Sequence, residues 1–137
     1  MKLKIKVAIP GQIIWEGEGI EMSIQTTTGK MGILPNHAPL VAALEGSVLT
    51  IKNNENTTSL MAISDGYISL EKNNVFIATD RCVLEERIDS NKLDIEYKIA
   101  LEKYNTAERP VKKLLAQRTL RRLNACYEIL KYRKQMN

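Results

Sequence analysis

Residues 59–71, SLMAISDGYISLE, carry the clearest signal for β structure in this chain. Two short runs rich in apolar residues, 59–64 and 67–71, flank the dipeptide Asp65-Gly66. Such a dipeptide favours a two-residue turn between antiparallel strands, because both of its residues tolerate positive φ. The stretch therefore predicts a β-hairpin, and it indicates that this part of the chain folds as β-sheet.

Further runs on both sides of this stretch have the same character. Residues 3–9 alternate apolar and lysine side chains and are followed by the turn residues Pro10-Gly11. Additional strands are expected at 20–24, 47–52 and 75–79, with turn-forming residues at 28–29, 53–56 and 72–74. Gly29 and Gly32 are interpreted as turn residues with positive φ, since no phosphate-binding loop motif includes them. Short strands at this spacing predict an all-β sandwich or flattened barrel.

In the last third of the chain the spacing of apolar residues changes to three and four. One apolar stripe runs over residues 93–104, and Asp89 or Ser90 is expected to cap that helix. Pro110 breaks the pattern, because the residue before a proline disfavours the helical region. A second helix is expected over residues 111–134.

Together these patterns predict a β-sandwich domain over residues 1–87, followed by an antiparallel two-helix hairpin over residues 88–137. A hairpin of two helices has too little apolar area to be stable alone. It is therefore expected to pack on the β domain or on another protein.

The composition excludes several classes of protein. With 137 residues, of which 44% are hydrophobic and 26% charged, the chain has room for one globular domain with a small appendage. No run approaches the roughly 20 apolar residues that cross a bilayer. The alternating N-terminus is interpreted as a strand and not a signal peptide, so the mature chain is expected to begin at or near Met1. Cys82 and Cys126 belong to no CxxC or Cys/His motif, which favours two reduced thiols over a disulfide or a zinc site.

Positive charge is concentrated towards the C-terminus. The chain has a net charge of +4, and residues 109–137 contain nine Lys or Arg and one acid, a charge of +8, which leaves −4 for residues 1–108. Arg118, Arg121 and Arg122 fall within about one helical turn and are expected to share one side of the helix. Three interpretations stay open: a solvated face, a nucleic-acid-binding surface, or a helix that docks on an acidic protein surface.

The one histidine of the chain lies in residues 29–40, GKMGILPNHAPL, between Pro35 and Pro39. A catalytic histidine needs a nucleophile or carboxylate within reach, and neither an HExxH nor a GxSxG motif recruits His37. The flanking prolines fix φ and stiffen the segment. We therefore interpret it as a rigid structural or interface corner, and we predict no catalytic residue, no bound metal and no cofactor.

The same segment resembles a signature of the epsilon subunit of the rotary F-type ATP synthase, G-x-x-G-[VI]-L-x-x-H-A-P. The similarity extends over essentially the whole chain. Residues 7–10, VAIP, followed by Ile14-Trp15, are similar to the family's opening strand and turn. Residues 62–67, AISDGY, fall where the family carries a glycine-containing hairpin. The order of sandwich and helical hairpin derived above is also the fold of this family.

The resemblance implies a non-catalytic subunit of the central stalk, which couples proton-driven rotation to ATP synthesis. In the family the sandwich binds the gamma subunit and rests on the ring of c subunits. Leu34, Pro35, His37 and Pro39 are therefore expected to contact the c-ring or the foot of the stalk. No contact with nucleic acid is implied, and association with the membrane is expected only through the complex.

The family's hairpin either folds on the sandwich or extends towards the catalytic head, where it blocks ATP hydrolysis. Its second helix meets an acidic loop of the catalytic beta subunit, and Arg118, Arg121 and Arg122 match that basic helix in kind. Some bacterial members bind ATP through an I/L-D-x-x-R-A motif, for which this chain has IDSNKL at residues 88–93. Lysine lacks the planar guanidinium and leucine is larger than alanine, so nucleotide binding is not expected here.

The PNHAP form of the loop resembles plastid and cyanobacterial members. The resemblance implies a chloroplast protein at the stromal side of the thylakoid membrane, with the cytoplasmic face of a bacterial or cyanobacterial membrane as the alternative. Two functions stay open: the stalk subunit, and a small β domain with a basic helical tail that binds nucleic acid. A steep salt dependence of oligonucleotide binding would favour the second.

Overall fold

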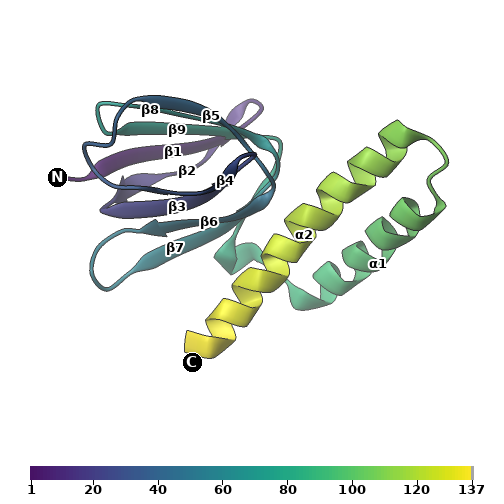
Figure 1. Cartoon of the computed structure of the whole chain (residues 1–137). Coiled ribbons are helices and arrows are strands. Elements are labelled where there is room, and N and C mark those ends of the chain that lie inside the picture. Colours follow the sequence, from purple (N-terminus) through teal and green to yellow (C-terminus); the bar gives the residue numbers. More distant parts are fainter. Residues whose placement is uncertain (137) are drawn as a thin grey trace.

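The structure, a computed structural model, describes residues 1–136 and consists of a β-sandwich followed by two helices (Figure 1). Its strands are β1 (Leu3–Ile9), β2 (Gln12–Gly19), β3 (Glu21–Thr26), β4 (Gly29–Ile33), β5 (Leu40–Leu44), β6 (Ser47–Lys52), β7 (Thr58–Ile63), β8 (Gly66–Glu71), β9 (Asn74–Thr79) and β10 (Cys82–Leu84). A 3-10 helix, Glu85–Arg87, leads into α1 (Ser90–Thr106) and α2 (Pro110–Met136). The predicted order of a β-sandwich and a helical hairpin is confirmed.

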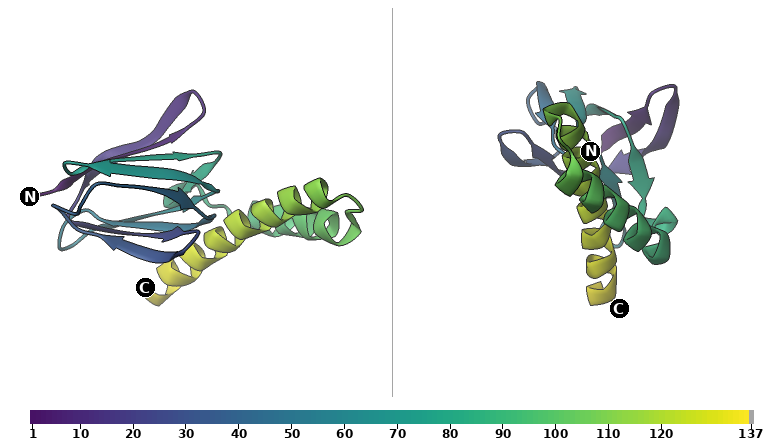
Figure 2. Two further views of the ribbon diagram at one scale, coloured as in Figure 1. Left: turned by 45° about the horizontal axis from the view of Figure 1, so that its top comes forward. Right: turned by 90° about the vertical axis from the view of Figure 1, so that its right-hand side faces the viewer.

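Two sheets pack face to face in the sandwich. One has the strand order β5-β8-β9-β1-β2 and the other β10-β7-β6-β3-β4, and they join where Thr26 of β3 pairs with Leu44 of β5. The paired strands of residues 1–136 are antiparallel except β1 and β9, which run in parallel. Figure 1 and Figure 2 show the two layers with the hairpin leaving from one end of the sandwich.

Most strands expected from the sequence are present. The runs at 3–9, 20–24, 47–52 and 75–79 correspond to β1, β3, β6 and β9. Four strands, β2, β4, β5 and β10, have no counterpart among the predicted elements. All four end a sheet in the strand orders above. Their sequences, QIIWEGEG, GKMGI, LVAAL and CVL, show no clear alternation of apolar and polar residues, so the period-two signal is weak in each.

The two glycines of segment 29–40 differ in conformation. Gly29 has a φ of 138° at the turn from β3 into β4, as predicted. Gly32 lies within β4 opposite Ser23 and is not among the residues with positive φ, so its assignment to a turn is wrong. The corner itself is shorter than predicted and comprises residues 34–39, between β4 and β5.

The hairpin predicted at Asp65-Gly66 is wrong. β7 pairs with β6 and β10, whereas β8 pairs with β5 and β9, so this dipeptide carries the chain from one sheet to the other. The hydroxyl of Thr79 fixes the crossing by donating a shared hydrogen bond to the carbonyl oxygens of Ser64 (2.9 Å) and Asp65 (3.2 Å). A Cβ on Gly66 would overlap the carbonyl oxygen of Ala78, so only glycine fits at this crossing.

β7 is buried on both faces and connects two apolar clusters. Met61 and Ile63 point into the sandwich, where they join alternate residues of β1, β3, β6, β8 and β9 in the inner core. Leu60 and Ala62 point the other way and pack against the helices. We call this second cluster the docking cluster; its buried members are Leu60, Ala62, Leu93, Ala100, Leu123, Ala125, Cys126 and Ile129.

α2 lies against β6 and β7, and α1 packs mainly on α2. Asp89, and not Ser90, is the N-cap of α1, because its carboxylate accepts the backbone N–H groups of Asn91 and Lys92. α2 begins at Pro110, where the fixed φ of proline suits the first helical turn. The tip of the hairpin projects beyond the sandwich (Figure 2). Neither helix, over the described residues, has a stretch long and apolar enough to span a bilayer.

Candidate functional site

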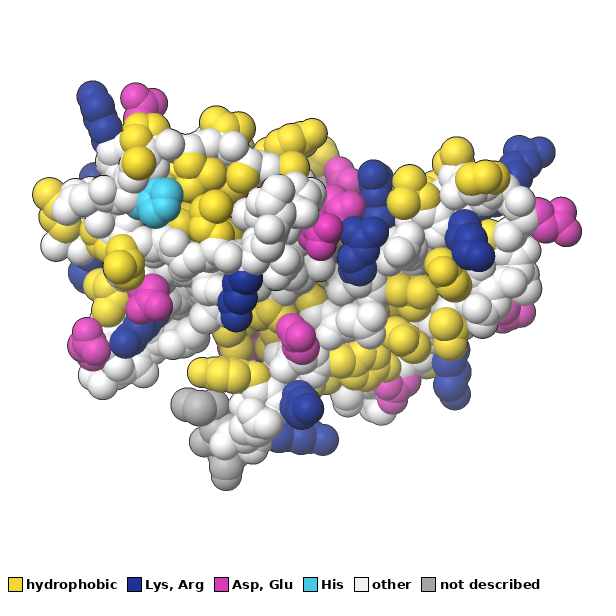
Figure 3. Space-filling model, in the orientation of Figure 1, with side chains coloured by type: hydrophobic (Ala, Val, Ile, Leu, Met, Phe, Trp, Pro, Cys, Tyr) yellow, Lys and Arg dark blue, Asp and Glu magenta, His cyan; other side chains and the backbone are white. Residues whose placement is uncertain are grey.

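The corner between β4 and β5 carries four of the residues expected to contact a partner. Leu34 and Pro39 are exposed, and Pro35 and His37 are half-buried. The backbone N–H of His37 donates to the carbonyl oxygen of Leu34 (3.2 Å), and ring Nδ1 donates to that of Ala38 (2.7 Å). Within the described part of the chain the imidazole is bonded to backbone and to no carboxylate or nucleophile, which fits a structural corner. Figure 3 shows the histidine at the surface beside hydrophobic side chains.

Asn36 and Asn73 clasp this corner to the turn between β8 and β9. Both have positive φ, 70° and 65°. The N–H of Asn36 donates to Oδ1 of Asn73 (2.6 Å), and Nδ2 of Asn73 donates to Oδ1 of Asn36 (3.4 Å). The carbonyl oxygen of Asn73 also accepts the N–H of Lys4 (2.7 Å), which ties the corner to β1. Sequence reasoning found Asn73 only as a turn residue, because nothing local to it indicates a partner 37 positions away.

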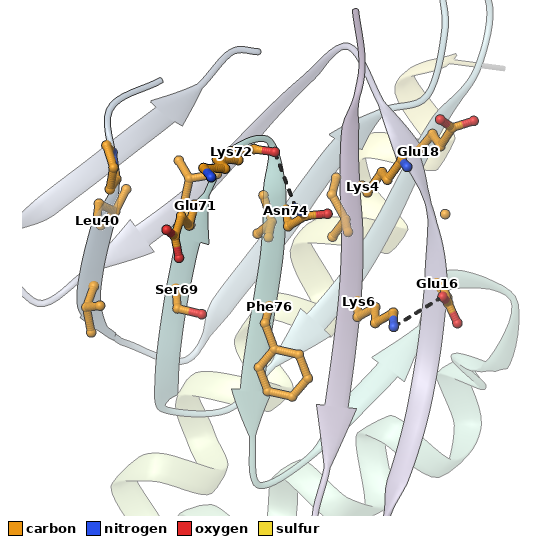
Figure 4. A pocket seen from close by; sticks show the side chains of 16 residues that line it. Lys4, Lys6, Glu16, Glu18, Leu40, Ser69, Glu71, Lys72, Asn74 and Phe76 are labelled. Atoms are coloured by element: carbon orange, nitrogen blue, oxygen red, sulfur yellow. Dashed lines mark hydrogen bonds and ion pairs between the residues drawn. The ribbon is translucent and has the colours of Figure 1, made fainter. Parts of the chain in front are cut away.

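The outer face of the β5-β8-β9-β1-β2 sheet is hollowed and partly apolar. The exposed hydrophobic side chains that the strand register places on this face are Ile13, Val41, Tyr67 and Phe76. Figure 4 shows Phe76 in this hollow beside Lys6, whose Nζ lies 3.7 Å from the carboxylate of Glu16. Apolar groups surrounded by charged ones are typical of a surface that binds another protein. We call this surface the outer face.

Arg118 and Arg121 of α2 both reach Asp65 at the crossing between the sheets. Nε of Arg118 lies 3.2 Å from Oδ2, and Nη1 of Arg121 lies 3.3 Å from Oδ1. The same Oδ1 accepts the N–H of Gly46 (2.8 Å). The carboxylate is only 26% exposed, so water screens these ion pairs incompletely. Figure 3 shows acidic and basic side chains meeting where the hairpin leaves the sandwich. In this structure the sandwich itself engages two of the arginines expected to face a partner.

Arg122 has a different environment from Arg118 and Arg121, although it lies one helical turn after Arg118. Arg121 and Arg122 are about 100° apart around the helix, with Arg118 between them in direction, so Arg122 lies at the margin of this side that is next to α1. It is 5% exposed and lines the cleft between α1 and α2. Burial, and secondly the charge of Arg81, lower the pKa of its guanidinium. Its side chain takes part in none of the ion pairs within residues 1–136.

A second ionic contact joins the other end of α2 to the end of the β domain. Nε of Arg133 donates to the carboxylate of Glu85 (3.0 Å), and Nη2 donates to its backbone oxygen (2.6 Å). Sequence reasoning missed this pair, since its members are 48 positions apart and belong to no motif. The docking cluster is therefore flanked by an ionic contact at each end.

The two cysteines are free thiols in different clusters. Cys82 packs against the inner core and Cys126 lies in the docking cluster, so the expectation of two unpaired thiols is confirmed. Burial raises the pKa of Cys82 to about 12 and also raises that of Cys126. Both thiols are therefore neutral and slow to react near pH 7 while the protein is folded.

Segment 88–93 serves the folding of the hairpin. Asp89 caps α1, and Leu93, at the position where the bacterial ATP motif has alanine, is buried in the docking cluster. The larger side chain of Leu93 thus occupies space that the alanine of the bacterial motif leaves unfilled. The absence of nucleotide binding stays a prediction.

Known proteins resemble this chain along most of its length. A family profile described as "ATP synthase, Delta/Epsilon chain, beta-sandwich domain" matches residues 2–85. The chloroplastic ATP synthase epsilon chain of Bigelowiella natans is 62% identical over 134 residues, 97% of this chain and 98% of that one. The cyanelle epsilon chain of Cyanophora paradoxa is 33% identical, covering 82% and 85%. An ATP synthase epsilon chain of Leptospira interrogans is 34% identical, covering 89% and 93%.

Solved structures share the fold. A chain of the mitochondrial ATP synthase of Euglena gracilis, in an OSCP/F1/c-ring structure, superposes with a TM-score of 0.78 at 21% identity and covers 94% of this chain and 81% of that one. A central stalk/c-ring structure from Tetrahymena thermophila gives 0.61 at 13% identity, with 96% of each chain covered. These relatives give no support to a nucleic-acid-binding module. From the profile and the curated relatives, the chain belongs to the family of ATP synthase epsilon chains.

Proposed function

We propose that this chain is a non-catalytic subunit of the central stalk of a proton-translocating ATP synthase, and that it couples rotation to ATP synthesis and inhibits ATP hydrolysis through its helical hairpin. The observation that carries the proposal is a hairpin attached to the sandwich by one apolar cluster and two ionic contacts, in a member of the epsilon family. Catalysis belongs to other subunits of the complex.

The sandwich supplies the contacts to the stalk and the ring. The corner at 34–39, with Leu34, Pro35, His37 and Pro39, faces the c-ring or the foot of the stalk. Its prolines and the Asn36–Asn73 clasp keep it stiff, which reduces the conformational entropy lost on binding. The outer face, with its four exposed apolar side chains, receives the gamma subunit. Association with the membrane arises through these partners.

The hairpin supplies the inhibition. In the docked form Arg118 and Arg121 are paired with Asp65. When the hairpin extends, these arginines and Arg122 become available to an acidic loop of the catalytic beta subunit. A switch of this kind needs two arrangements of similar free energy, and a hairpin attached over a small area meets that need.

The complex belongs in the chloroplast, at the stromal side of the thylakoid membrane. The relatives from Bigelowiella natans and Cyanophora paradoxa, named chloroplastic and cyanelle proteins, support this location. The alternative location is the cytoplasmic face of a bacterial membrane, which the similarity to the Leptospira interrogans protein supports.

Deleting the chain from Ile88 onward tests the division of roles between the two parts. We expect the remaining sandwich to copurify with the gamma and c subunits, because the inner core lies wholly within residues 3–84. We also expect faster ATP hydrolysis by the assembled enzyme, measured as phosphate release. Loss of copurification would contradict the stalk role, and unchanged hydrolysis would contradict the inhibitory role.

Replacing both Arg118 and Arg121 by alanine in the assembled enzyme should also relieve inhibition, most at low ionic strength, where attraction between charges is least screened. The double variant Lys131→Ala with Lys134→Ala is the matched control, because it removes the same charge from exposed positions of the same helix. Equal effects of the two double variants would show that net charge, and not these arginines, is what matters.

A further inference from the structure

We propose that Asp65 is a latch: the residue that holds the hairpin on the sandwich and thereby keeps Arg118 and Arg121 away from the catalytic head. This inference rests on the proposed inhibitory role of the hairpin. It adds the single carboxylate that sets the balance between the docked and the released hairpin.

Contacts within the sandwich position Asp65 independently of the hairpin. Its Oδ1 accepts the N–H of Gly46 (2.8 Å), and its backbone oxygen accepts from the hydroxyl of Thr79 (3.2 Å). Both of these partners belong to the sandwich, so the carboxylate is held in place without the helix. Docking then brings the guanidinium groups of Arg118 (3.2 Å) and Arg121 (3.3 Å) to a carboxylate that is already in position.

A second group, the guanidinium of Arg122, opposes docking, so the docked state depends more strongly on the ion pairs of Asp65. Arg122 is 5% exposed and has no carboxylate paired with it within residues 1–136. Arg81, the nearby cation whose charge disfavours the charged guanidinium, belongs to the sandwich. That repulsion therefore exists only when the hairpin is docked. The charge of Glu96 on α1 favours the charged guanidinium, but burial and Arg81 outweigh it, and the pKa of Arg122 is lowered. Burying this cation therefore destabilises the docked state, which relies on its remaining contacts.

The two native cysteines report on docking within one molecule. Cys126 is 3% exposed in the docking cluster, and Cys82 packs against the inner core. Release of the hairpin exposes Cys126 to alkylation by N-ethylmaleimide, whereas Cys82 is half-buried on the edge strand β10 and reports on the sandwich. Mass spectrometry of the two peptides gives both alkylation rates from the full-length chain.

The test variant is Asp65→Asn, which keeps an oxygen for the N–H of Gly46 and removes the charge. We expect the alkylation rate of Cys126 to rise about fivefold to tenfold at low ionic strength, as two partly shielded ion pairs would give, with Cys82 unchanged. The matched control is Asp80→Asn, since Asp80 is exposed and forms none of the ion pairs of residues 1–136. It should leave both rates at the wild-type value.

Further results decide the proposal. High salt should reduce the difference between Asp65→Asn and the wild type, and Arg122→Met should slow alkylation of Cys126 by removing the opposing charge. An unchanged rate at Cys126 in Asp65→Asn, or a parallel rise at Cys82 that reports general unfolding, would overturn the latch. So would a rise of the same size in Asp80→Asn.

In the assembled enzyme, Asp65→Asn should lower ATP hydrolysis further, whereas the arginine variants described above raise it. If Asp65→Asn releases Cys126 but leaves hydrolysis unchanged, the latch stands and the inhibitory role fails. If truncation from Ile88 raises hydrolysis but Asp65→Asn changes neither readout, the inhibitory role stands and the latch fails.

Discussion

At Gly66 the chain passes between the sheets with no room for a side chain. A Cβ there would overlap the carbonyl oxygen of Ala78 and lie 2.9 Å from the Cα of Thr79. Both obstacles are backbone atoms of β9, which cannot move aside without breaking the pairing of β8 with β9. We expect Gly66→Ala to lower the free energy of unfolding by about 3 kcal/mol or more, measured by urea denaturation.

Gly32→Ala is the control for this substitution. Among residues 1–136 the structure places no neighbouring atom within 4 Å of a Cβ at position 32, and the residue has no positive φ, so alanine fits without strain. Its free energy of unfolding should stay within about 0.5 kcal/mol of the wild type. Equal losses in the two variants would mean that the crossing at Gly66 is not the critical feature.

Cys82 makes the stability of the sandwich depend on alkaline pH. Burial raises the pKa of its thiol from 9.0 to about 12, so the folded protein keeps a proton that the unfolded chain loses from about pH 9. Its contribution is constant below pH 9, and the free energy of unfolding falls between pH 9 and pH 12 by up to about 1.4 kcal/mol per pH unit.

Urea denaturation at pH 8, 9 and 10.5 measures this slope. In Cys82→Ala the loss of stability with pH should be smaller than in the wild type, whatever the substitution costs at pH 8. Parallel slopes in the two proteins would show that the thiol ionises freely in the folded state.

Single residues were predictable from the sequence where their role is local. Asp89 as a helix cap and Pro110 as a helix start depend on neighbours within a few positions. The roles of Asp65 and Glu85 depend on arginines 56 and 48 positions later, and no local pattern indicates such pairs. Helical spacing alone does not show that Arg122 is buried, because its burial depends on how α1 packs against α2.

The first turn of α1 depends on one carboxylate. Asp89 accepts the N–H groups of Asn91 (3.0 Å) and Lys92 (3.3 Å), and α1 has little support besides α2. We expect Asp89→Ala to destabilise the helix by about 1 kcal/mol and to speed amide hydrogen exchange in its first turn. Ser90→Ala is the matched control, because Asp89, and not the neighbouring exposed serine, is the N-cap of α1. An equal effect of the two substitutions would contradict the assignment of Asp89 as the cap.

Among the strands and helices, those with a clear period were predictable. β1, β8 and β9 alternate buried and exposed residues, β6 alternates buried and half-buried ones, and their positions follow from that alternation. β7 is buried on both faces, because the hairpin covers its outer side. The sequence shows that β7 and β8 are neighbours in the chain, but which strands they pair with depends on long-range contacts. The turn dipeptide at 65–66 therefore predicted pairing where the chain changes sheets.

The molecule has two apolar clusters of unequal extent, so its parts should open separately. The inner core draws on both sheets, whereas the docking cluster joins the hairpin to β7 through a few side chains. Native-state hydrogen exchange should show amides of α1 and α2 opening with a lower free energy than those of β1 and β8. A single free energy for all amides would contradict this.

Leu123→Ala sharpens the same measurement. Leu123 is buried in the docking cluster, and its truncation should lower the opening free energy of the hairpin by about 2–4 kcal/mol. Amides of β1 and β8 should keep their exchange rates, because the inner core is untouched.

The parallel pairing of β1 with β9 affects how this protein folds during its synthesis. Ile5 pairs with Val75, which lies 70 positions later (75 minus 5). During translation β1 therefore cannot pair with β9 until those 70 residues have been synthesised. At translation rates of about 5–20 residues per second, that wait lasts roughly 4–14 s. Meanwhile Leu3, Ile5 and Val7 stay uncovered, and the lysines at positions 2, 4 and 6 repel other nascent chains by like charge. The alternation that shapes β1 thus also protects it from aggregation during synthesis.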